Sequence, residues 1–220
     1  MKHKLLAVVL LAASAAPVQA ALLTENFDNV AGLTGSGWIL LNNSAAPGNS
    51  WFQGNSGVFA SYNGAPDSYI AANFLAASSG SIDLWLLTPV LDLSGALNLS
   101  FFTRRNDSPF YDTLDVRVSA NGASSNLADF ASSLALSQLL DGADYPIDWT
   151  PVSASVAGQG AGATGRIAFH YTVANVAALG DYIGLDAVSI AVPEPPQLAL
   201  LLMALIALGF RRPRFRRSTV

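Results

Sequence analysis

His170 is the natural candidate for a catalytic base, because the only other histidine, His3, lies close to the N-terminus. It stands in the alternating segment from Arg166 to Val173, on the face opposite the apolar residues. A nucleophilic triad needs such a base at a cleft, beside an orienting carboxylate and a nucleophile. No serine is marked out as that nucleophile, and the chain has no cysteine. We therefore expect His170 to be a structural residue.

Paired carboxylates are the second candidate for catalysis, since glycoside hydrolysis uses one carboxyl as acid and another as base or nucleophile. Asp112 and Asp115 form one candidate pair, and Asp141, Asp144 and Asp148 form a second group. Loop aspartates are abundant in acidic exported proteins, so their number alone identifies no site. A glycan-active hydrolase with paired Asp residues is therefore the alternative to a non-enzymatic function.

Two carboxylates favour a metal site. In strands that alternate with period two, Glu25 and Asp186 each share a face with apolar neighbours. A buried carboxylate must be paired or metal-bound, and only four cationic side chains lie between residues 21 and 192. Calcium is the hard, oxygen-seeking cation for such a place. We predict a structural calcium held by Glu25 and Asp186, with Asp28 as an additional ligand. The alternative is that these carboxylates form hydrogen bonds to the backbone or are exposed at strand ends.

The four tryptophans, Trp38, Trp51, Trp85 and Trp149, are candidates for stacking against sugars. Each lies in or near an expected strand, where packing in the core is the commoner role of a tryptophan. Trp51 is followed by the polar segment from Gln53 to Asn55, so it is the one that we select as a candidate glycan contact.

The elements that must position these residues are all of one type. Short runs rich in β-branched and aromatic residues alternate with Gly, Asn, Ser and Pro clusters, which predicts strands without helices. The expected strands are Leu22–Phe27, Trp38–Leu41, Ser68–Asn73, Ile82–Pro89, Leu97–Phe101, Thr113–Val118, Asp148–Val156, Arg166–Val173 and Tyr182–Ile190. Asn126 to Leu140 is expected to hold a short helix or a loop. The pattern favours an all-β fold, a β-sandwich of jelly-roll type.

The net charge of the chain between its two ends limits the classes of partner that it can bind. Between residues 21 and 192 the chain carries four arginines, no lysine and 14 carboxylates, a net charge of −10. Such a surface repels nucleic acid and anionic lipid, and it suits divalent cations and neutral partners such as sugars. The absence of cysteine excludes a disulfide framework.

Both ends of the chain have the composition of processing segments. Residues 1–20 contain Lys2 and Lys4, an apolar run and small residues before Ala20, which is typical of a signal peptide cleaved by signal peptidase. The C-terminal segment 192–220 has a proline-rich start, an apolar run at 198–210 and five arginines. Arginines that follow an apolar run stay on the cytoplasmic side, so the tail predicts transient anchoring in the inner membrane. The fold is thus expected to be flanked by a signal helix and a hydrophobic sorting helix.

The order of Val192, Pro193, Glu194 and Pro195, the apolar run and the arginines resembles a PEP-CTERM sorting signal. The resemblance implies cleavage by an exosortase in a Gram-negative bacterium that makes exopolysaccharide. The alternative is an ordinary membrane anchor that is not cleaved.

The segment between the two ends resembles the choice-of-anchor J domain, which is related to cleaved-adhesin and MAM-like jelly rolls. The resemblance spans nearly all of residues 21–191 and rests on the order of short segments, among them Glu25–Asp28, Trp51–Asn55, Ser68–Phe74, Trp85–Leu93, Gly165–Tyr171 and Asp181–Asp186. It implies a non-enzymatic protein at the cell surface or in the extracellular matrix, associated with adhesion or exopolysaccharide.

Overall fold

The computed structural model describes residues 21–193. The expected signal segment 1–20, the residues Glu194 and Pro195 and the hydrophobic segment 198–210 lie outside the described residues. In the part that is described, no helix is long and apolar enough to cross a membrane.

The first of two sheets, here sheet A, has six strands in antiparallel pairs. Its order is β10 (Thr150–Val156), β7 (Leu97–Arg105), β12 (Tyr182–Ala191), β4 (Ile70–Asn73) and β3 (Phe52–Gln53). The N-terminal strand β1 (Ala21–Glu25) also pairs with β12. As a result β12 is bonded to β7 on one side, and to β4 and then β1 on the other.

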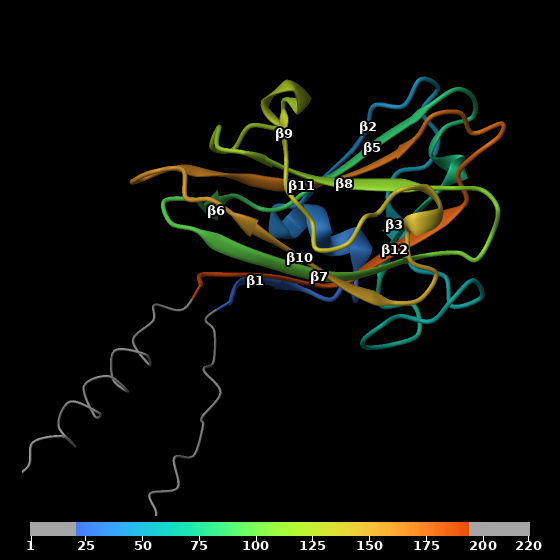
Figure 1. Ribbon diagram of the computed structural model, residues 1–220, viewed down its shortest axis with the longest axis horizontal. Helices are drawn as coiled ribbons and strands as arrows, with labels where there is room; N and C mark the ends of the chain where they lie inside the picture. Colours follow the sequence, from blue (N-terminus) through green and yellow to red (C-terminus); the bar gives the residue numbers. More distant parts are fainter. Residues whose placement is uncertain (1–20, 194–220) are drawn as a thin grey trace, which may run out of the picture.

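The second sheet, sheet B, faces the first across the core (Figure 1). Its order is β2 (Ile39–Asn42), β5 (Ile82–Leu87), β11 (Thr164–Val173), β8 (Thr113–Ser119) and β9 (Ser132–Ser133), with β6 (Leu91–Asp92) paired to the start of β11. All of its pairs are antiparallel as well. The expectation of an all-β sandwich is therefore confirmed as two packed antiparallel sheets.

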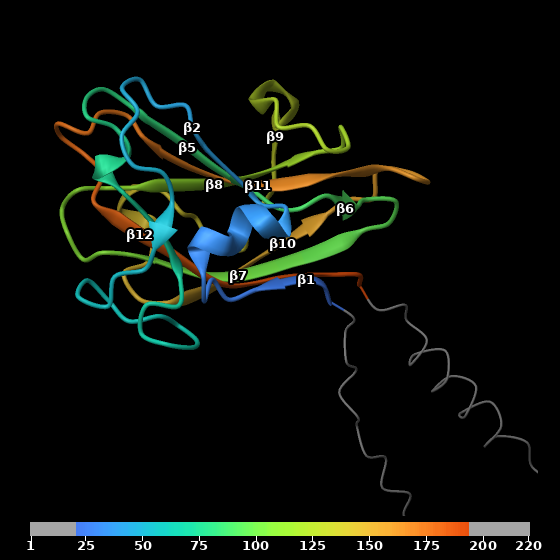
Figure 2. The ribbon, with the colours of Figure 1, turned by 180° about the vertical axis from the view of Figure 1, so that it is seen from behind.

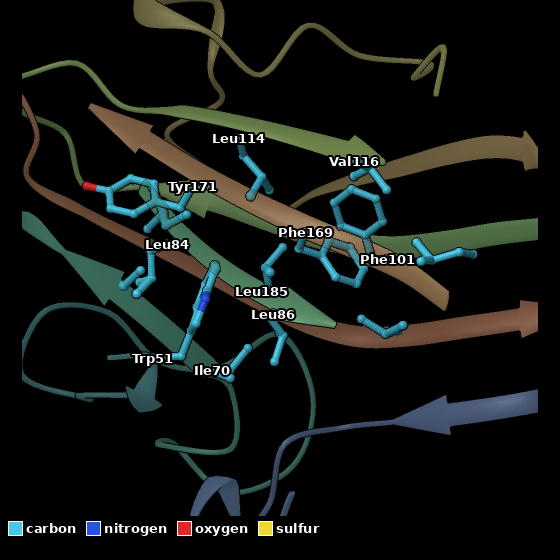
Figure 3. Packing of buried hydrophobic residues seen from close by; sticks show 14 of the residues in the cluster. Trp51, Ile70, Leu84, Leu86, Phe101, Leu114, Val116, Phe169, Tyr171 and Leu185 are labelled. Atoms are coloured by element: carbon cyan, nitrogen blue, oxygen red, sulfur yellow. The ribbon is translucent and has the colours of Figure 1, made fainter. Parts of the chain in front are cut away.

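The core lies between the inner faces of the sheets because each strand directs alternate side chains inward. Phe169 from β11 and Phe101 from β7 meet edge to face, with their ring centroids 5.2 Å apart. Figure 3 shows both rings among Leu114, Val116 and other buried aliphatic side chains of the two sheets. Period-two alternation therefore identified the inner face correctly.

Within residues 21–193, four short 3-10 helices lie outside the sheets: η1 (Val30–Ser36), η2 (Phe74–Ala76), η3 (Leu127–Asp129) and η4 (Gly142–Asp144). The first of them, η1, contacts β2 and β3 and covers one open side of the sandwich, as Figure 2 shows. Val30 and Leu33 are its buried residues. On the opposite side the chain between β9 and β10 passes from sheet B to sheet A, since the N–H of Leu134 donates to the carbonyl of Val116 and the N–H of Ser137 donates to the carbonyl of Ser153.

Both ends of the described chain lie at one end of the sandwich, which we call the proximal end. Ala21 pairs with Ala191 there (Figure 1). At the opposite, distal end are the loop between β7 and β8, the loop between β11 and β12, η2 and η4, as both ribbon views show.

Each of the nine expected strands overlaps an observed one. The sequence pattern missed β3, β6 and β9, which have two residues each and are too short to show a period. The segment from Asn126 to Leu140 holds η3 and β9, so it contains a short helix within a loop, as expected.

Candidate functional site

Asp186 is fully buried, but on the outer face of sheet A rather than the inner one. The register of β12 against β7 shifts between Asp186 and Ser189, and Ala187 has a φ of 49°. This β-bulge reverses the alternation, so Asp186 pairs with Phe102, whereas Val188 packs in the core. The prediction that Asp186 shares a face with its apolar neighbours Val188 and Ile190 was therefore wrong.

The loop that precedes β4 covers Asp186 and satisfies its carboxylate. Oδ2 accepts hydrogen bonds from the backbone N–H groups of Tyr62 and Asn63, both at 2.9 Å, and Oδ1 accepts one from the N–H of Ala187 at 2.6 Å. Burial raises the pKa of Asp186 to about 6, and the negative charge of Asp28 acts in the same direction. The three backbone bonds act against this shift.

Asp28 reaches the same region just after the end of β1, whereas Glu25 pairs with Val188, whose side chain packs in the core on the opposite face of sheet A from Asp186. The Oε1 of Glu25 accepts a hydrogen bond from the backbone N–H of Phe27 at 2.8 Å, and Phe27 has a φ of 54°. Asp28 is exposed, and its Oδ1 lies beside Gly64 in the loop over Asp186. Asp28 and Asp186 are thus close enough to influence each other, while Glu25 is engaged by its own turn.

Calcium at this place stays a prediction. Among residues 21–193 there is no group of three or more His, Cys, Asp or Glu side chains that could hold a metal ion. The backbone N–H groups that bind Glu25 and Asp186 are the alternative that we considered for these carboxylates. A calcium ion here would need backbone carbonyl oxygens in addition to the side chains of Asp28 and Asp186.

Trp51, the candidate glycan contact, is only 4% exposed. Its ring packs edge to face against Tyr171, with centroids 6.3 Å apart, and Figure 3 shows it among the core side chains. The prediction that Trp51 contacts a glycan was therefore wrong, and its role is core packing. Trp38 and Trp85 are also buried. Trp149 is partly buried, and its Nε1 donates to the carbonyl of Ala60 at 2.8 Å.

His170 lies on the outer face of sheet B and is held by Asp83, with 2.7 Å between Nε2 and Oδ1. Its ring stacks on that of Trp85 at a centroid distance of 3.7 Å. Burial lowers the pKa of His170, although Asp83 opposes this effect. Burial also opposes the ionisation of Asp83, yet hydrogen bonds from Asn43, His170 and Trp85 keep its pKa below the ordinary value.

This histidine has a carboxylate partner but no nucleophile. Its Nδ1 is buried and has no hydrogen-bond partner in the described part of the chain. A hydroxyl activated by the histidine would have to bond to that nitrogen. The arrangement supports the interpretation of His170 as a structural residue.

Of the carboxylates considered for hydrolysis, Asp112 and Asp115 do not face one another, whereas Asp115 and Asp141 line the same groove on sheet B. Asp112 is buried and accepts a hydrogen bond from the hydroxyl of Tyr171 at 2.6 Å. Asp115 lies on the outer face of sheet B, 2.7 Å from the Nε of Arg117. Asp141 accepts a bond from the hydroxyl of Thr113 at 2.5 Å. Asp112 and Asp115 therefore have separate surroundings, and their pairing finds no support.

Two shallow grooves mark the outer faces of the sheets. One, of about 480 Å³, lies on sheet B beside His170, Arg117 and Asp141. The other, of about 530 Å³, lies on sheet A over β10, β7 and β12. A row of four hydroxyl side chains crosses this second groove and continues onto β1, since the registers place Ser153, Ser100, Ser189 and Thr24 side by side. This row could not be predicted from the sequence, because its four strands come from distant parts of the chain and their order in the sheet was not known.

Solved structures share this fold. The K1 cleaved adhesin domain of Lys-gingipain from Porphyromonas gingivalis W83 matches with a TM-score of 0.57 and 19% identity, over 78% of this chain and 98% of that domain. The K3 cleaved adhesin domain of the same protein matches with a TM-score of 0.53 and 17% identity, over 79% of this chain and all of that domain. No protein-family model matches the chain, and no curated sequence does so either. At this level of identity the likeness shows the β-sandwich fold.

Proposed function

We propose that this chain is an exported protein of the choice-of-anchor J type that binds a partner at the cell surface or in the extracellular matrix and catalyses no reaction. The observation that carries the proposal is the fold shared with cleaved adhesin domains over nearly their full length. The engagement of His170 and Asp83 in structural hydrogen bonds is consistent with it.

The proposal includes a PEP-CTERM signal, read by an exosortase after signal peptidase has removed residues 1–20. The pairing of Ala21 with Ala191 supports this arrangement. A tail that begins after Ala191 leaves the sandwich at the proximal end, so the distal loops point away from the membrane or matrix to which the tail leads. A binding domain displayed in this way has its distal end free for a partner.

Exopolysaccharide is the partner that we propose. The net charge of −10 between residues 21 and 192 disfavours polyanions such as nucleic acid. The row of hydroxyl side chains on sheet A offers donors and acceptors suited to a neutral sugar chain.

The exported full-length protein should be tested for binding to a panel of neutral and charged polysaccharides, and the release of reducing ends should be measured in the same samples. The proposal predicts binding to a polysaccharide without release of reducing ends. Release of reducing ends that depends on Asp115 or Asp141 would contradict it.

A further inference from the structure

Five large apolar side chains are exposed on the loops of the distal end. They are Phe74, Leu75, Phe110, Tyr111 and Ile147, and each is between 39% and 49% exposed. They come from η2, from the loop between β7 and β8, and from the segment that follows η4. We call this set the distal apolar patch.

Backbone contacts bring these loops together. The N–H of Gly180 donates to the carbonyl of Tyr111 at 2.9 Å, and the N–H of Phe74 donates to the carbonyl of Asp181 at 3.0 Å. Gly180 and Asp181 are consecutive, so Tyr111 and Phe74 flank one short stretch of chain. Members of the patch that lie far apart in the sequence are therefore neighbours on the surface.

Arg105 connects Ile147, the remaining member of the patch, to Tyr111. Its guanidinium lies over the ring of Tyr111, 5.5 Å from the centroid, and its backbone N–H donates to the carbonyl of Pro146, next to Ile147. The Nε and Nη1 of Arg105 donate to the carbonyls of Tyr145, Asn106 and Ser108. These bonds fix the base of two distal loops, so the patch rests on an ordered support.

The charge around the patch is negative. Asp107, Asp144 and Asp148 are exposed in the same loops, and Asp181 is half-buried beside Phe74. Two arginines belong to the same region: Arg105 is only 6% exposed, and the positive charge of Arg104 interacts with Asp148. The four carboxylates outnumber these two cations, so the net charge around the patch stays negative. A uronic-acid or sulfated polymer would be repelled here, whereas a neutral polymer would not.

The size of the patch favours a slender partner. At about 200 Å² for a large side chain, the exposed parts of the five side chains come to roughly 400 Å². A specific protein partner usually covers about 800 Å² on each side. A pyranose ring has an apolar face that packs on an aromatic ring, and its hydroxyl groups donate hydrogen bonds to carboxylates.

We propose that the distal apolar patch binds a neutral polysaccharide, with the rings of Phe110, Tyr111 and Phe74 against sugar faces and the surrounding aspartates as acceptors for sugar hydroxyl groups. This inference rests on the proposed function and assigns the polysaccharide to a particular place on the chain.

The test uses the exported full-length protein and three named probes: dextran and galactomannan as neutral polymers, and alginate as a polyuronate. The double variant Phe110→Ser with Tyr111→Ser should bind dextran or galactomannan, whichever the unmodified protein binds, with an affinity lower by about tenfold or more. Losses of this size are typical when side chains at the centre of an interface are removed. The matched control is Leu22→Ser with Val90→Ser, which removes exposed apolar side chains outside the patch. The control should bind unchanged. Equal unfolding midpoints of the variants would establish that both are folded.

The outcomes separate the two proposals. If a neutral polymer binds and the distal variant binds it equally well, the patch is not the site, while the proposed function stands. If none of the probes binds the unmodified protein, both the patch and the polysaccharide partner are contradicted. Tighter binding of alginate than of the neutral polymers would overturn the charge argument. A change of the sedimentation coefficient in the distal variant alone would show instead that the patch joins two copies of the chain.

Discussion

Asp112 has an unusual environment for a carboxylate. Its Oδ1 accepts hydrogen bonds from the hydroxyl of Tyr171 and from the N–H of Asp181, while its Oδ2 is buried and has no hydrogen-bond partner among residues 21–193. Burial raises the pKa of Asp112 to about 6, against the opposing effect of those hydrogen bonds. The neutral carboxyl is therefore favoured in the folded chain. Its contribution to stability is complete below the unfolded pKa, near 3.8, and is lost as the pH rises through about 6.

Replacement of Asp112 by Asn should remove this pH dependence. The variant keeps an oxygen for Tyr171 and Asp181 and cannot ionise, so at pH 8 it should be more stable than the unmodified chain by up to about 3 kcal/mol. The difference should shrink towards zero below about pH 4. Denaturant unfolding at several pH values measures it, and an equal difference at pH 4 and pH 8 would contradict the argument. Asp186 titrates in the same range in both proteins, so only the difference between them is informative.

Calcium should stabilise the protein if Glu25, Asp28 and Asp186 contribute to one site. A cation that binds only the folded state at 100 times its dissociation constant adds about 2.7 kcal/mol, which corresponds to about 5–10 °C in the unfolding midpoint. The double change Glu25→Gln with Asp186→Asn should abolish this rise, and the milder change Asp28→Asn should reduce it. Asp107→Asn, at an exposed position in a distal loop, is the control. Identical midpoints in chelator and in millimolar calcium would rule the site out.

The individual residues were less predictable than their strands. The carboxylates of the candidate metal site could be selected by type, but the bulge at Ala187 that turns Asp186 outward left no mark in the alternation. Trp51 precedes a strand of only two residues, and such a strand is too short to show the alternation from which the burial of Trp51 could be judged. The distal apolar patch could not be predicted, because its members meet only through long-range contacts.

The strands themselves followed from alternation because one face of each must be buried. Alternation within Thr113–Val118 and Arg166–Val173 puts Leu114 and Val116, and Ile167 and Phe169, on one face of each strand. All four are buried, and Val118 packs against the same core while partly exposed. Alternation could not predict the order of the strands in each sheet, because strands far apart in the sequence pair with one another, as β1 does with β12.

Phe169 tests the assignment of the inner face. Its side chain is fully buried and meets Phe101 of the opposite sheet. The change Phe169→Ala should cost about 3–5 kcal/mol, because it removes buried surface and leaves a cavity. Thr172→Ala, which alters the outer face of the same strand, is the control and should cost far less. Urea denaturation measures both, and a loss below about 1 kcal/mol for Phe169→Ala would be incompatible with this core.

For the molecule as a whole, the main prediction concerns processing. The segment from Val192 to Pro195 should direct cleavage close to itself, which would remove the apolar run at 198–210 and the arginines. Intact-mass measurement of the protein extracted from the cell surface should therefore give a species that begins near Ala21 and lacks this tail. A mature species that still ends at Val220 would mean that the tail is a plain anchor. Changing Glu194 to Ala, with the apolar run unaltered, separates recognition of the motif from membrane insertion.

The placement of β12 also has a mechanical consequence. This strand is the last of the described chain, and it is bonded on both sides along most of its length, to β7 and to β4 and β1. If the tail is held and a ligand pulls on the distal loops, the force runs along β12 and loads these hydrogen bonds in shear. They must then break together, whereas an edge strand pulled sideways would lose its bonds one at a time. Resistance to forced unfolding is set by the rate of that concerted step rather than by equilibrium stability. The chain leaves the sandwich from a strand suited to carry tension.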